Sequence, residues 1–92
     1  MYMDSTLETG PPKDLPVIVY TRTGCETCRA VLEFLELKGV TFVERDIARD
    51  PVAADELATL TQGAATAPVT LAGGKVVVGF DPSALVRELG LN

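Results

Sequence analysis

Apolar residues along the chain change their spacing from one segment to the next, and this spacing predicts the elements. Val17–Tyr20 is a short continuous apolar run, which is typical of a strand buried on both faces. From Glu26 to Lys38 the spacing becomes helical, and Lys38 followed by Gly39 predicts the end of that helix. Its apolar stripe consists of Cys28, Val31, Leu32, Phe34, Leu35 and Leu37.

The middle of the chain predicts a second strand and a second helix. Thr41–Ile47 alternates apolar and charged residues, so we expect a strand more exposed than the first. Asp50-Pro51 has the pattern of an N-cap followed by proline at the first helical position, and the helix should end near Gln62-Gly63. We expect its apolar side to be Ala53, Ala54, Leu57, Ala58 and Leu60.

The last third predicts a hairpin and a third helix. Val69–Leu71 and Val76–Val78 are β-branched runs joined by a segment that contains Gly73-Gly74, which favours a tight turn. Asp81-Pro82 repeats the cap-then-proline pattern before a helix that Gly90 should stop. Its apolar residues are Leu85, Val86 and Leu89.

The predicted order is therefore β-α-β-α-β-β-α, an α/β chain. A strand, helix and strand in succession require a parallel crossover, and the hairpin adds antiparallel strands, which gives a mixed four-stranded sheet with helices on both faces. This is a minimal thioredoxin-like core. Residues 1–15 are polar, contain Gly10-Pro11-Pro12 and lack periodicity, so we expect a flexible leader before a single domain at 16–92.

The charge and the lengths of the apolar runs indicate which partners the protein is not expected to bind. The 92 residues carry 8 basic and 13 acidic side chains, a net charge of −5, which argues against nucleic acid as the main partner. No apolar run approaches the roughly 20 residues of a membrane span, and the N-terminus lacks the apolar core of a signal peptide. We therefore expect no membrane association and a cytoplasmic location, where a pair of cysteines is more often catalytic than structural.

The only two cysteines form a Cys25-x-x-Cys28 motif between the first strand and the first helix. A thiol at a helix N-terminus is favoured as the thiolate by unpaired N–H groups and the helix dipole. Cys25 is therefore the predicted nucleophile. Cys28, nearly one turn further on the same face, lies within reach and is the predicted resolving residue.

Other interpretations of the pair remain. A self-contained zinc site needs about four ligands, and the chain has no other cysteine and no histidine. A stapling disulfide across two residues would remove little unfolded-state entropy. Half of a metal or iron–sulfur site shared between two chains is open. Redox chemistry is the favoured interpretation.

Charged residues flank the motif. Arg22 is either a solvated loop cation or a group that stabilises the Cys25 thiolate or meets an acidic partner. Glu26 should act in the opposite direction and raise the pKa of Cys25. Arg29 is expected to be exposed on the helix, and Tyr20 to belong to the core.

The residues Val17–Arg29, Thr66-Ala67-Pro68 and Gly79-Phe80 together resemble the glutaredoxin family over about residues 16–90. Among its members, the chain is most similar to NrdH-type redoxins, which carry a basic residue three before the first cysteine and a Gly-Phe-x-Pro stretch. Glu26-Thr27 replaces the usual Pro-Tyr between the cysteines, and the glycine pair and acidic pair that help hold glutathione are replaced by Gly79-Phe80 and Ser83-Ala84.

The resemblance implies a glutaredoxin fold and a thiol–disulfide oxidoreductase without a metal or cofactor. Cys25 and Cys28 would be catalytic, and Pro68 would be cis, leaving neighbouring backbone groups free to pair with a substrate strand. The implied substrate-binding residues are Arg22, Thr66, Ala67, Pro68, Gly79 and Phe80.

The resemblance also implies partners. Electrons would come from thioredoxin reductase, and the target would be a disulfide-containing protein such as ribonucleotide reductase or a peroxidase, with the redoxin itself a monomer. Two alternatives stay open: a glutaredoxin that depends on glutathione or another low-molecular-weight thiol, and an iron–sulfur carrier dimer in which Cys25 of two chains bridges a cluster.

Overall fold

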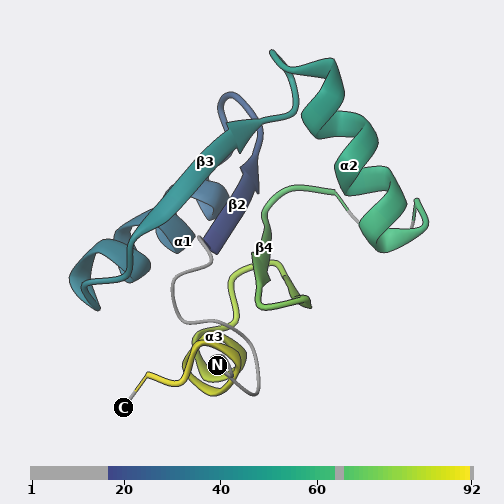
Figure 1. Cartoon of the computed structure of the whole chain (residues 1–92). Helices are drawn as coiled ribbons and strands as arrows, with labels where there is room; N and C mark the ends of the chain where they lie inside the picture. The colour runs from purple at the N-terminus through teal and green to yellow at the C-terminus, as the bar shows by residue number, and fades with distance from the viewer. Residues whose placement is uncertain (1–16, 64–65, 92) are drawn as a thin grey trace, which may run out of the picture.

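The seven predicted elements are present in the predicted order (Figure 1). A computed structural model describes residues 17–63 and 66–91, so the predicted leader at 1–15 lies outside the described residues. Most predicted bounds hold to within about one residue. The elements are β2 (Val17–Thr21), α1 (Glu26–Leu37), β3 (Phe42–Asp46), α2 (Pro51–Thr61), β4 (Val69–Ala72), β5 (Lys75–Val78) and α3 (Pro82–Leu89).

The four described strands form one mixed sheet in the order β3-β2-β4-β5. β2 pairs with β3 in parallel, whereas β4 is antiparallel to both β2 and β5. In this register Val19 lies opposite Glu44 on one side and Thr70 on the other. The exposed, charged β3 is an edge strand, which confirms the prediction that it would be less buried than the central β2.

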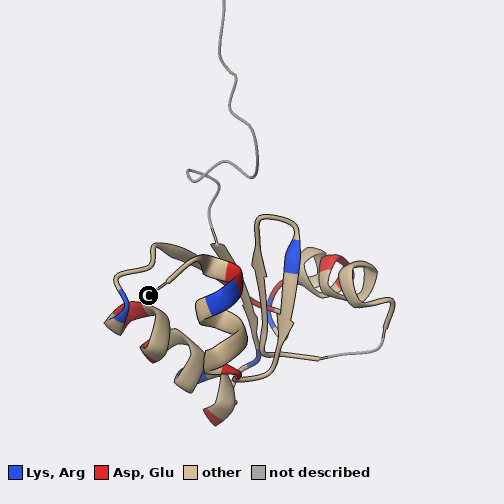
Figure 2. Ribbon diagram, turned by 90° about the horizontal axis from the view of Figure 1, so that it is seen from below, with Lys and Arg blue, Asp and Glu red and all other residues tan. Residues whose placement is uncertain are grey.

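Helices cover both faces of the sheet, as predicted, because side chains alternate along each strand (Figure 2). Val19 faces α1, where it packs against Val31 and Leu35. Its neighbour Tyr20 points to the opposite face and packs against α2. Leu85 of α3 is buried on the α1 face beside Val77 of β5. The two faces therefore have separate apolar cores.

Both predicted cap-then-proline motifs begin helices. The Asp50 carboxylate accepts hydrogen bonds from the N–H groups of Val52 and Ala53 at the start of α2. The Asp81 carboxylate accepts one of 3.1 Å from Ala84 N–H at the start of α3. These bonds satisfy donors that a helix N-terminus otherwise leaves unpaired, so each helix starts where the sequence predicts.

Three residues assigned to the apolar helix faces are exposed, which corrects the prediction. Leu37 is 86% exposed, since a step of two residues from the buried Leu35 turns about 200° around the helix. Ala58 is exposed because it lies about 100° from Leu57 on α2. Leu60, in the last turn of α2, is 37% exposed. The buried faces of both helices are narrower than the apolar pattern suggests.

No helix within residues 17–63 and 66–91 is both long and apolar enough to cross a membrane.

Candidate active site

Cys25 and Cys28 are positioned by the turn that joins β2 to α1. Cys25 is the N-cap residue of α1, and its own N–H donates to the carbonyl oxygen of Arg22 across the turn. The N–H of Cys28 donates a hydrogen bond of 3.1 Å to the sulfur of Cys25. The first thiol therefore caps the helix in the way that a serine or aspartate does elsewhere. Both thiols are free.

The two thiols have opposite electrostatic environments. Burial acts to raise the pKa of Cys25, but hydrogen bonds from the Cys28 thiol and from the backbone of Cys28 and Thr27, together with the positive charge of Arg22, hold that pKa below its ordinary value. Cys28 is only 3% exposed, and burial followed by its hydrogen bond to Cys25 raises its pKa to about 11. Of the two thiols, Cys25 is therefore the one that ionises first.

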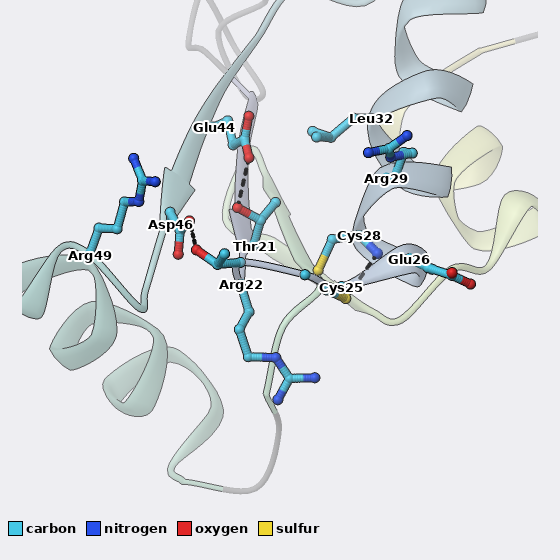
Figure 3. Close-up of a pocket in the computed structure, with 12 residues that line it drawn as sticks. Thr21, Arg22, Cys25, Glu26, Cys28, Arg29, Leu32, Glu44, Asp46 and Arg49 are labelled. Atoms are coloured by element: carbon cyan, nitrogen blue, oxygen red, sulfur yellow. Dashed lines mark hydrogen bonds between the residues drawn. The ribbon is translucent and has the colours of Figure 1, made fainter.

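The sequence also predicted a role for three other residues near the CxxC motif. Arg22 is exposed, and its charge contributes to the lowered pKa of Cys25. Glu26, expected to raise that pKa, points away from the Cys25 sulfur, and the net shift is downward (Figure 3). Tyr20 is a core residue, as predicted, and its hydroxyl donates to Glu56 at 3.1 Å.

The segment Thr66-Ala67-Pro68 lies at the same end of the sheet as the dithiol. Tyr20 pairs with Val69, so Pro68, which precedes Val69, lies beside the end of β2. The Ala67-Pro68 peptide bond is cis, as predicted. The Pro68 carbonyl oxygen accepts a hydrogen bond from Gly79 N–H at 2.8 Å. Ala67 and Pro68 are buried, whereas Thr66 is exposed.

The Ala67 backbone makes no hydrogen bond within residues 17–63 and 66–91. The expectation of free backbone groups beside the proline therefore fits Ala67 but not the Pro68 carbonyl, which Gly79 already occupies.

Phe80 follows Gly79 at this same end of the sheet. Its side chain is 42% exposed, and its ring meets the ring of Phe34 edge to face, with centroids 5.9 Å apart. The contact with α1 holds the ring in place and leaves part of Phe80 exposed to solvent. Phe80 is therefore a partly exposed aromatic residue that Phe34 holds in place, and not a core phenylalanine.

A groove of about 680 Å³ opens beside the dithiol, between α1 and the end of β3 (Figure 3). Of the residues predicted for the site, Cys25, Cys28 and Arg22 line it, whereas those around Pro68 and Phe80 do not. Its complete lining is Thr21, Arg22, Thr23, Gly24, Cys25, Glu26, Cys28, Arg29, Leu32, Glu44, Asp46 and Arg49.

Sequence reasoning missed the β3 wall of this groove. Glu44 accepts a hydrogen bond of 2.9 Å from the Thr21 hydroxyl, and Asp46 accepts one of 2.7 Å from Thr23 (Figure 3). The bond from Thr23 is the main cause that lowers the pKa of Asp46. The parallel pairing of β2 with β3 was a usable signal, because the carboxyl ends of parallel strands lie at one edge.

No group of three or more metal-binding side chains occurs in the part of the chain that the structure describes.

Comparisons with known proteins agree with this geometry. A family model described as Glutaredoxin matches residues 17–77. A comparison with curated proteins finds no relative. Among solved structures, the NrdH-redoxin from Escherichia coli, described as a glutaredoxin-like protein with a thioredoxin-like activity profile, is 33% identical with a TM-score of 0.71, over 79% of this chain and 93% of that one.

Two further solved structures are similar. A mutant of the thioredoxin-like protein BC3987 is 29% identical with a TM-score of 0.76, over 83% of this chain and 96% of that one. A glutaredoxin from Brucella melitensis is 32% identical with a TM-score of 0.63, over 88% of this chain and 87% of that one.

Proposed function

The chain belongs to the glutaredoxin family of thiol–disulfide oxidoreductases, and from this premise we propose that it is a dithiol redoxin that reduces protein disulfides through Cys25 and Cys28. The observation that carries the proposal is the contrast between the two thiols. Cys25 is partly exposed and has a lowered pKa, whereas Cys28 is buried with a pKa of about 11. A nucleophile and a resolving residue need this difference.

The proposed reaction has two exchange steps. The Cys25 thiolate attacks one sulfur of the target disulfide, which forms a mixed disulfide and releases the other target sulfur as a thiolate. Cys28 then loses its proton and attacks the Cys25 sulfur, which releases the second target thiolate and leaves a Cys25–Cys28 disulfide. Two electrons pass to the target, and its two thiolates take up protons. A reductant must then supply two electrons and two protons to the redoxin.

We assign that reductant to thioredoxin reductase and not to glutathione. Glutathione is anionic at neutral pH, and a site that selects it needs free donors or cations for its carboxylates. Here the Asp81 carboxylate accepts the Ala84 N–H at the start of α3, so it occupies a donor that an anion could use. The exposed Phe80 offers an apolar contact that suits a protein surface better than a tripeptide.

The substrate contacts fall on the loops around the dithiol. Thr66 and the Ala67 backbone would border an extended substrate segment beside Pro68 and Gly79, and Phe80 would contact the partner protein. A target such as ribonucleotide reductase or a peroxidase has the required disulfide. A dithiol that must return to its reduced form suits a reducing compartment such as the cytoplasm.

A coupled assay tests the electron donor. NADPH oxidation is followed with a disulfide substrate, using thioredoxin reductase in one reaction and glutathione with glutathione reductase in the other. We expect turnover with thioredoxin reductase and little with glutathione, and Cys25→Ser supplies the background in both. Efficient turnover with glutathione alone would instead assign the chain to the glutathione-dependent glutaredoxins.

A further inference from the structure

The turn that joins β2 to α1 is not held in place by burial. Arg22, Thr23 and Gly24 are all exposed, so apolar packing does not fix their conformation. Gly24 has a φ of +78°, and a Cβ atom there would meet nothing within 4 Å, so no neighbouring group closes around this glycine. The next residue is Cys25, and any freedom in the turn therefore moves the reacting sulfur.

The side chains of this turn reach another strand through one residue, Asp46. Of these side chains, only that of Thr23 forms a hydrogen bond within residues 17–63 and 66–91, and it donates to the Asp46 carboxylate at 2.7 Å (Figure 3). The bond of 3.2 Å from Cys25 N–H to the Arg22 carbonyl oxygen closes the turn on itself and does not attach it to β3. Asp46 therefore anchors the turn to the sheet.

Asp46 is itself fixed by several contacts. It is the last residue of β3 and pairs in register with Thr21. Its other carboxylate oxygen accepts a hydrogen bond of 2.8 Å from Ala48 N–H, and its carbonyl oxygen accepts from the N–H groups of Arg49 and Asp50. One residue thus holds both the connection from β3 to α2 and the turn before the dithiol.

The electrostatics at Asp46 agree with this geometry. The hydrogen bond from the Thr23 side chain, followed by the bond from Ala48 N–H, outweighs burial and holds the pKa of Asp46 below its ordinary value. The positive charge of Arg49 and the Thr23 backbone N–H act in the same direction. Asp46 is therefore ionised at neutral pH, and a charged acceptor makes a stronger hydrogen bond than a neutral one.

We propose that Asp46 is a positioning residue for the nucleophile, which holds the turn through Thr23 so that Cys25 stays aligned at the N-terminus of α1. The Cys25 sulfur can accept the N–H of Cys28 at 3.1 Å only while it lies at that terminus. Release of the turn should weaken this bond and move the charge of Arg22 relative to the sulfur. The inference rests on the function proposed above and adds a residue that lies outside the CxxC motif.

A second carboxylate on β3 provides a matched control. Glu44 also lines the groove and accepts a hydrogen bond of 2.9 Å from the Thr21 hydroxyl. Thr21, however, belongs to β2, and its carbonyl oxygen accepts Ile47 N–H at 2.9 Å, so its backbone is held without Glu44. Loss of the Glu44 carboxylate should therefore remove a negative charge from the groove while Cys25 stays in place.

The pH profile of Cys25 alkylation by iodoacetamide tests the proposal without any disulfide substrate. Thr23→Val replaces the hydroxyl by a methyl group without a change of charge, and it should raise the midpoint by roughly half a pH unit. Asp46→Ala should also raise the midpoint, although loss of a nearby negative charge alone would lower it. Thr23→Ser, which keeps the hydroxyl, and Glu44→Ala should not raise it. Mass spectrometry locates the label on Cys25.

The double variant shows whether Thr23 and Asp46 act through one bond. Thr23→Val combined with Asp46→Ala should shift the midpoint no further than Asp46→Ala alone, because the second change finds the bond already lost. Urea denaturation of each variant shows that it is folded under the assay conditions. If Asp46→Ala does not fold, Thr23→Val with Thr23→Ser decides the question.

The outcomes separate this inference from the proposed function. An unchanged midpoint in Thr23→Val, or an equal rise in Glu44→Ala, would overturn the positioning role of Asp46 while disulfide reduction by the parent protein remained. If the parent protein reduced no disulfide peptide, the proposed function would fail, yet the alkylation profiles would still decide whether Asp46 positions Cys25.

Discussion

The backbone N–H of Cys28 donates a hydrogen bond of 3.1 Å to the sulfur of Cys25. The residue proposed to resolve the mixed disulfide thus also helps to hold the nucleophile as a thiolate. The spacing of two intervening residues produces this relationship, because it places the second cysteine at the first free N–H groups of α1. A serine at position 28 would keep this N–H, whereas a serine at position 25 would remove the nucleophile.

The first prediction concerns these two substitutions. Cys25→Ser should abolish disulfide reduction, whereas Cys28→Ser should still attack a disulfide and accumulate the mixed disulfide, since nothing resolves it. Mass spectrometry after mixing with a disulfide peptide measures the trapped adduct. Trapping through Cys28 at neutral pH would reverse the assigned roles.

The second prediction concerns pH. A thiol reacts with iodoacetamide only as the thiolate, so the rate rises with pH through its pKa and then levels off. Because hydrogen bonds and Arg22 outweigh burial and lower the pKa of Cys25, the rise should come at lower pH than for a free cysteine. Cys28, with a pKa of about 11, should react much more slowly than Cys25 up to about pH 9.

Arg22→Gln tests the electrostatic part of that argument. Loss of its positive charge should move the midpoint of the alkylation profile to higher pH, because the thiolate loses a favourable interaction. Arg87→Gln, distant along the chain and paired with Glu88, should leave the midpoint unchanged. A parent midpoint at or above that of a free thiol would contradict the assignment.

Much of the fold follows from local signals in the sequence. Asp50-Pro51 and Asp81-Pro82 mark helix starts because a carboxylate and a proline suit the unpaired N–H groups there, and both helices begin as predicted. Exposure of single residues is harder to predict. Leu37 is apolar like a core residue, but it lies on the side of α1 away from the buried Leu35 and is exposed to solvent.

The parts of the site that lie close together in the sequence were predictable, whereas those that depend on contacts between distant segments were less so. The CxxC motif identifies Cys25 and Cys28 because their roles depend on contacts within a single helix terminus. The predicted parallel crossover brings the carboxyl ends of β2 and β3 to one edge of the sheet, but the pairing of Thr21 with Asp46 also needs the strand register, which the local pattern of either strand does not give. Arg49, which follows β3, reaches the groove only through that wall and was therefore also missed.

The third prediction uses two leucines of α1 as a matched pair. Leu35 is fully buried, so Leu35→Ala should lower the free energy of unfolding by about 2–5 kcal/mol. Leu37→Ala removes the same atoms from an 86% exposed side chain and should change it by less than about 0.5 kcal/mol. Urea denaturation measures both, and similar losses would show that Leu37 is buried in solution.

The fourth prediction concerns the start of α3. Asp81→Ala removes the acceptor for Ala84 N–H and should lower the free energy of unfolding by about 1 kcal/mol. Asp81→Asn keeps an acceptor of similar shape and should retain most of that stability. If asparagine were as damaging as alanine, the carboxylate charge and not the hydrogen bond would be the stabilising feature.

The last prediction separates the functional use of Phe80 from its packing. The ring contacts Phe34 and the residue is 42% exposed, so Phe80→Ala should cost about 1–3 kcal/mol of stability from the lost aromatic contact and partial burial. A partly exposed aromatic at the same end of the sheet as the dithiol can act as an anchor for a partner protein, and loss of an anchor costs more than about 1 kcal/mol of binding. We therefore expect kcat/KM with thioredoxin reductase to fall roughly tenfold. Val78→Ala, two residues earlier and 55% exposed, is the control and should keep its activity. If Phe80→Ala changed only the denaturation midpoint, Phe80 would be a packing residue, and the preference for a protein donor would need another origin.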